Sequence, residues 1–144
     1  MVPSPEVMTT IAVSTCSLAA AVIDLRTRHV PNALTGAAAA VGFVLALTGA
    51  GRVGIAASIV GGVIGLALMM PGYLFGATGG GDVKLLAAVG TLLGPQRIFF
   101  AFFGMAIGGG VIALAIAAYR GQLRNQMFAY APAIAVGAIF AVLR

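Results

Sequence analysis

The apolar residues of this chain gather in runs that are about as long as a lipid bilayer is thick. A membrane-spanning helix needs about 20 predominantly apolar residues. Of the 144 residues, 61% are hydrophobic and 8% are charged, whereas soluble domains carry about 25% charged residues. A soluble chain of this length could not bury so much apolar surface. The sequence therefore predicts an all-α, polytopic membrane helix bundle.

Polar breaks divide the chain into about six apolar segments, which we interpret as one integral membrane domain over residues 1–144. The predicted transmembrane helices cover about residues 6–24, 32–48, 53–73, 83–93, 98–119 and 127–143. Asn32 follows a proline and is expected to cap the second helix. Glycine-rich stretches at 59–68 and 107–116 predict close helix packing through small residues.

Charged residues predict the orientation. Glu6 precedes the first apolar segment and Arg26 follows it, which is the reverse of a signal peptide and predicts a retained helix with its N-terminus outside. The inner loops then hold Arg26, Arg28, Lys84, Arg120 and Arg124, and the outer positions hold Arg52, Arg97 and Arg144. This bias agrees with the positive-inside rule and predicts an N-out/C-out protein. Because topology explains these scattered basic residues, no nucleic-acid partner is expected.

Two of the three acidic residues are the candidate catalytic groups. Asp24 and Asp82 are separated by two complete membrane helices, so both are expected on the cytoplasmic side. Two carboxyl groups in a poorly solvated cavity cannot both ionise cheaply. One can take a proton from water while the other protonates a scissile carbonyl, which is aspartic-protease chemistry without a metal or a cofactor. For either residue alone, a plain helix-capping role is the structural alternative.

Three glycines, Gly79, Gly80 and Gly81, directly precede Asp82. The helix that follows them, 83–93, would be only about 16 Å long, so its inner end would lie below the membrane surface. We expect irregular backbone at these glycines, lining a wet cavity at membrane depth. Such a stretch gives an extended peptide a side-chain-free edge to approach, for example by strand addition.

Three motifs in this order resemble the GxGD intramembrane aspartyl proteases, and specifically the prepilin (type IV leader) peptidases. They are "DLRTRHVPN" at 24–32, "GGGDVKLL" at 79–86 and "YAPAIAVGA" at 130–138. The resemblance covers nearly the whole chain. It implies an endopeptidase of the bacterial inner membrane that removes the basic leader of prepilin or pseudopilin precursors at the cytoplasmic face.

The resemblance also implies residue roles. Asp24 and Asp82 would be the catalytic pair, and the three glycines would shape the substrate site, with Arg26 and Arg28 as further candidate substrate contacts. The larger family members carry paired cysteines and also N-methylate their product. This chain has a single cysteine and resembles the short, peptidase-only members that serve tight-adherence (Flp-type) pili, so no methylation is expected.

Two other classes of function fit the composition. In a small proton- or cation-coupled transporter, Asp24 and Asp82 would relay protons, and glutamate would replace either residue more readily than in a protease. A non-catalytic membrane subunit of an assembly machine would tolerate alanine at both positions. Membrane lipid is an expected partner in every case, and the sequence is compatible with a monomer or a homo-oligomer.

Overall fold

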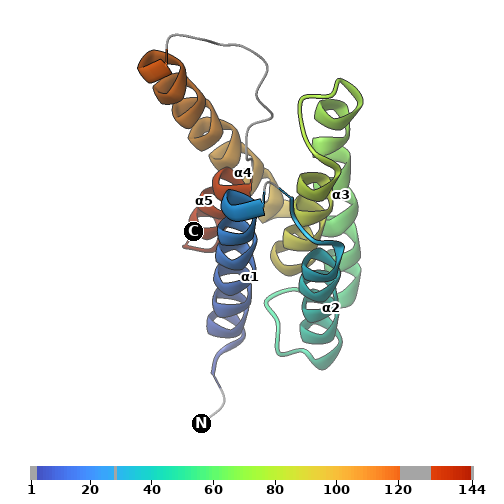
Figure 1. Cartoon of the computed structure of the whole chain (residues 1–144). Helices are drawn as coiled ribbons and strands as arrows, with labels where there is room; N and C mark the ends of the chain where they lie inside the picture. Colours follow the sequence, from blue (N-terminus) through green and yellow to red (C-terminus); the bar gives the residue numbers. More distant parts are fainter. Residues whose placement is uncertain (1–2, 28, 121–130, 144) are drawn as a thin grey trace.

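The computed structural model describes residues 3–27, 29–120 and 131–143. All regular elements in these ranges are helices, which confirms the predicted all-α class. The elements are α1 (Pro5–Thr27), α2 (Asn32–Thr48), α3 (Ile55–Leu74), α4 (Gly80–Arg120) and α5 (Ala131–Leu143). In Figure 1, α1 and α5 lie side by side, and α2 and α3 lie on the other side of α4.

Helix α4 is the centre of the bundle, because every other helix packs against it. It bends at Gly94, whose φ of 75° and ψ of 179° are accessible to glycine but not to other residues without strain. Pro95 follows and adds no backbone N–H donor. The non-helical Gly94 divides α4 into two helical segments, as the sequence predicted with a break at Gly94 and Pro95. The five labelled elements of the described residues therefore contain six helical segments.

Polar contacts tie together the end of the bundle where the chain begins. The Arg52 guanidinium pairs with Glu6 at 3.0 Å and donates from Nη1 to the Val142 carbonyl at 3.2 Å. Arg97 donates from Nη1 to the Ala141 carbonyl at 3.2 Å. The start of α1, the α2–α3 loop, the bend of α4 and the end of α5 thus meet at this end. The end of α1 and the start of α4 lie at the opposite end (Figure 1).

Two local predictions are wrong. Gly80 and Gly81 are not irregular backbone but the first helical residues of α4, and the non-helical stretch lies before them, at 75–79. Glycine is acceptable there because a first turn needs few intrahelical hydrogen bonds. Asn32 does not cap α2: the cap position is Pro31, without a side-chain hydrogen bond, and Asn32 begins the helix.

Apolar side chains fill the inside of the bundle and also cover its outside. The buried core includes Leu85, Leu86 and Ile134 together with many alanines. Large side chains on the outer faces are half exposed or more, among them Leu25, Leu47, Val63, Phe103 and Ile107. Three spans among the described residues are long and apolar enough to cross a membrane: Pro5–Thr27, Ile55–Leu74 and Gly80–Gly108. Lipid can cover this surface where water cannot, so the described residues form a membrane helix bundle.

Glycines let α3 approach α4 closely, as the sequence predicted for 59–68. A Cβ atom added to Gly61 would overlap the Gly90 carbonyl oxygen and lie 2.7 Å from Gly94 Cα. We therefore expect Gly61→Ala to destabilise the bundle by about 1–3 kcal/mol, the usual effect of overpacking. Thermal unfolding in detergent measures this change. Gly36→Ala is the control, because its Cβ would meet nothing within 4 Å, and equal melting of the two variants would contradict the expectation.

Candidate active site

Asp24 lies in the last turn of α1 and is almost fully buried, with 5% of its surface exposed. Thr9, Val13, Ser17 and Ala20 are also buried and precede it at helical spacing. These residues form one stripe of α1 that faces the bundle. The helix therefore directs the Asp24 carboxyl group inward and not toward water or lipid.

Asp82 is the third residue of α4 and is 7% exposed. Its Oδ2 accepts a hydrogen bond of 3.3 Å from the Gly79 backbone N–H, just before the helix. The Asp82 and Val83 backbone N–H groups donate in turn to the Gly79 carbonyl, at 3.1 and 3.4 Å. A carboxylate in the first turn that reaches back to the preceding residue stabilises the helix start and fixes its own rotamer.

The two carboxyl groups come together although 57 residues separate them in the sequence. Asp24 lies close enough for its charge to act on Asp82. Both groups are buried, and the end of α1 and the start of α4, which carry them, lie at the same end of the bundle (Figure 1). Two adjacent, poorly solvated carboxyl groups share protons unequally, so the arrangement can supply one acid and one base at the same place.

Gly81 allows the α1–α2 loop to lie against the start of α4. A Cβ atom on Gly81 would be 3.1 Å from the Val30 Cβ and 3.3 Å from the Val30 carbonyl oxygen. Val30 is itself buried, with 3% exposed surface. This contact holds the segment that follows Asp24 against the segment that carries Asp82. A side chain at position 81 would require Val30 to move by a few tenths of an ångström.

The other two glycines are less constrained. A Cβ on Gly79 would lie 3.4 Å from Asp82 Oδ2, and one on Gly80 would lie 3.5 Å from Tyr73 Cε2, which are ordinary contacts. Both glycines are partly exposed beside the carboxyl groups. The two positions leave the backbone at the start of α4 accessible from outside.

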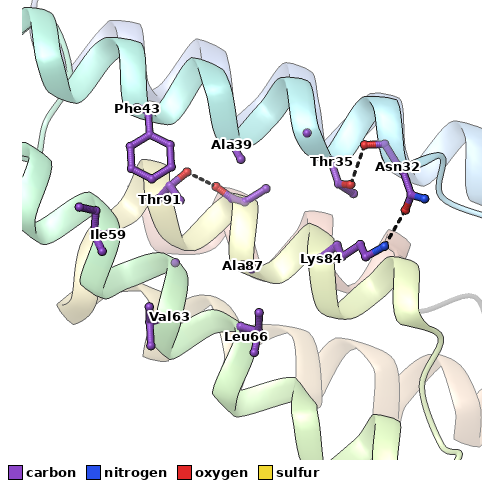
Figure 2. Close-up of a pocket in the computed structure, with 13 residues that line it drawn as sticks. Asn32, Thr35, Ala39, Phe43, Ile59, Val63, Leu66, Lys84, Ala87 and Thr91 are labelled. Atoms are coloured by element: carbon purple, nitrogen blue, oxygen red, sulfur yellow. Dashed lines mark hydrogen bonds between the residues drawn. The ribbon is translucent and has the colours of Figure 1, made fainter.

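Sequence reasoning missed the partner of Lys84. Its Nζ donates a hydrogen bond of 2.9 Å to Asn32 Oδ1, which connects the starts of α4 and α2 (Figure 2). Lys84 follows Asp82 by two residues, so the two side chains leave opposite sides of the helix. Lys84 and Asn32 also line one end of a groove of about 500 Å³ between α2 and α3. In the sequence, the position of Lys84 so close to Asp82 was the signal that this side chain matters. Residue spacing alone could not identify Asn32 as its partner.

The remaining candidates lie at the surface. Arg26 is exposed in the last turn of α1, and Arg28 lies outside the described residues. Within the described ranges, no three His, Cys, Asp or Glu side chains lie close enough together to hold a metal ion. The motif at 130–138 begins outside the described residues and continues into α5.

The fold and the site define a membrane helix bundle with two buried carboxyl groups at one end. Residues 11–114 match the type IV leader peptidase family. The chain belongs to this family.

Two curated relatives carry the name prepilin leader peptidase/N-methyltransferase. The protein of Bacillus subtilis is 42% identical over 69 residues, which are 47% of this chain and 27% of the relative. The protein of Pectobacterium carotovorum is 31% identical over 129 residues, which are 85% of this chain and 46% of the relative. The chain thus spans less than half the length of either relative. No solved structure is significantly similar to it.

Proposed function

We propose that this protein is an intramembrane aspartic endopeptidase that removes the leader peptide of prepilin or pseudopilin precursors. The observation that carries the proposal is the meeting of Asp24 and Asp82, buried and within electrostatic reach, at one end of the bundle. Membership of the type IV leader peptidase family supports the substrate class. Buried ionisable groups in a membrane protein are costly, which favours a functional role for both.

The two carboxyl groups divide the chemistry of peptide hydrolysis. The ionised one removes a proton from a water molecule, whose oxygen attacks the scissile carbonyl carbon. The protonated one donates to the carbonyl oxygen and stabilises the tetrahedral intermediate. When the C–N bond breaks, the leaving nitrogen takes up a proton from the carboxyl group that accepted it. No group outside the pair, the water and the substrate is required.

The glycines at the start of α4 provide the substrate contacts in this proposal. The first N–H groups of a helix have no intrahelical acceptor, so those of Gly80 and Gly81 are donors suited to a substrate carbonyl. This replaces the predicted strand addition, because both residues are helical. Gly79 carries no side chain that would block approach to Asp82. Arg26, exposed at the end of α1, is proposed to contact acidic groups of the precursor, as is Arg28.

We place the carboxyl pair on the cytoplasmic face of the bacterial inner membrane, with the protein multi-pass and N-out/C-out. The start of α1 and the end of α5 both contact Arg52, through Glu6 and the Val142 carbonyl. They meet at the end of the bundle away from the carboxyl pair, which fits this orientation. Membrane lipid surrounds the bundle, and the bundle is compatible with a monomer or a homo-oligomer. We further propose that the protein cleaves its substrate without N-methylating it. The ground for this is that the chain has a single cysteine and not paired cysteines.

The test is leader removal in reconstituted membranes. Vesicles that contain the wild-type protein and a pilin-like precursor of the same genome should yield the mature form, and vesicles without the protein should not. Mass spectrometry of the new N-terminus should show an unmodified amine even when S-adenosylmethionine is added. An uncleaved precursor together with proton flux across the vesicles would favour the transporter instead, and a methylated product would contradict the second part of the proposal.

A further inference from the structure

A groove runs along the bundle between α2 and α3, with α4 as its floor (Figure 2). It extends along α2 from Asn32 to Phe43, about 16 Å at the rise of a helix. The walls include Phe43, Ile59, Val63 and Leu66. It exists because α2 and α3 each pack on α4 and touch each other little.

The interior of this groove is apolar although two hydroxyl groups line it. Thr35 Oγ1 donates to the Asn32 carbonyl at 3.1 Å, and Thr91 Oγ1 donates to the Ala88 carbonyl at 2.7 Å. Both hydroxyls are thus used within their own helices. The other polar side chains of the groove, Lys84 and Asn32, lie at one end of it, the end of α4 that also carries Asp82. Small residues at Gly36, Ala39, Gly62 and Ala87 would let a helix approach closely.

We propose that this groove docks an apolar, membrane-inserted segment that the precursor carries next to its leader. The precursor chain then leaves the groove at Lys84 and reaches the carboxyl pair over the first turn of α4. This inference rests on the proposed peptidase function and extends it. The groove and the candidate site lie at the same end of α4, because Lys84 lines the groove and follows Asp82 by two residues.

The path from the groove to the carboxyl pair sets a length for the substrate. Lys84 and Asp82 lie on opposite sides of α4, so the chain must cross about one helix diameter, roughly 10 Å. An extended chain covers about 3.3 Å per residue, so on the order of three residues bridge that distance. The crossing passes Gly79, Gly80 and Gly81, where no side chain obstructs it. The scissile bond is thus expected about three residues before the apolar segment enters the groove.

Charge sets the direction of the bound precursor. The Lys84 ammonium stands at the mouth of the groove, and a basic leader is repelled there by like charge. The carboxyl pair attracts basic residues instead. The leader therefore lies on the far side of the scissile bond from the groove, and the apolar segment fills the groove.

Filling the groove tests this inference. A Cβ at Gly36 would meet nothing within 4 Å, so Gly36→Leu places its side chain in the groove without disturbing α2. We expect kcat/KM for the membrane-inserted precursor to fall by about tenfold or more, mainly through KM. Cleavage of a peptide that has the leader and the junction but lacks the apolar segment should stay within about twofold.

Ala37→Leu is the matched control, because Ala37 is the next residue of α2, is exposed and does not line the groove. It should leave both rates unchanged. Equal rates for Gly36→Leu and wild type on the precursor would overturn docking in the groove, and so would a parallel loss on both substrates. If Asp82→Asn cleaves like wild type, the aspartic mechanism fails, and if wild type does not cleave the precursor, the peptidase proposal fails; both results are distinct from failure of docking in the groove.

Photo-crosslinking tests the same contact without catalysis. In an Asp82→Asn background, benzoylphenylalanine at Val63, which is 62% exposed in the groove wall, should crosslink to the apolar segment of the precursor. The same probe at Val44, 56% exposed but outside the groove, should not. Adducts at Val63 only with lipid, or only with a second copy of this chain, would overturn the inference. This result decides the question if wild type does not cleave the short peptide.

Discussion

Asp82→Asn is expected to lower kcat for precursor cleavage by between about 10² and 10⁴-fold, and Asp24→Asn by a similar factor. Asparagine keeps the shape of the side chain but can neither take a proton from water nor give one to a carbonyl. Because the two carboxyl groups act as a unit, the double variant should be hardly worse than either single variant. Single-turnover cleavage in detergent or vesicles measures these rates, and gel filtration shows that each variant is folded.

The chain supplies a matched control for this experiment. Glu6 is the only other acidic residue in the sequence. It is 69% exposed at the opposite end of the bundle, where it pairs with Arg52. Glu6→Gln should cleave at the wild-type rate. A folded Asn variant at Asp24 or Asp82 with wild-type kcat would exclude the two-carboxylate mechanism, and full activity in both Asp→Glu variants would favour a proton relay.

Much of the fold was predictable because lipid imposes simple rules. Runs of apolar residues gave the helices close to their observed bounds, as at Asn32–Thr48. Counting two crossings between Asp24 and Asp82 placed both carboxyl groups at one end, as the structure has them. These predictions depend only on the length and hydrophobicity of each segment, so they do not require knowledge of how the side chains pack.

Local and long-range details were less predictable for a physical reason. Glycine is a poor helix former, so three glycines in a row indicated irregular backbone, yet Gly80 and Gly81 begin α4. Capping by the Asp82 carboxylate and contact with Val30 outweigh that local preference. The partner of Asn32 is Lys84, 52 residues away. No periodicity in a single sequence encodes such a pairing.

Gly81→Val is expected to reduce kcat by about 10²-fold, because a displacement on the order of 1 Å at a catalytic centre has that effect. Even an alanine Cβ would be 3.1 Å from Val30 Cβ, so the larger valine must push the α1–α2 loop away from α4. Asp24, six residues before Val30, would then move from Asp82. Single-turnover rates at saturating precursor measure the change in kcat separately from KM.

Two further variants separate positioning from a general loss of packing. Gly108→Ala in the same helix should behave as wild type, because its Cβ would make only an ordinary contact of 3.8 Å with Val136. Gly81→Ala should show a smaller defect than Gly81→Val, and Val30→Gly should relieve part of it by removing the crowded Cβ. A defect that Val30→Gly does not relieve would mean that Gly81 serves the substrate alone. Relief would mean that the loop contact sets the distance between the two carboxyl groups, so that a glycine chosen for backbone packing also controls the rate of the chemistry.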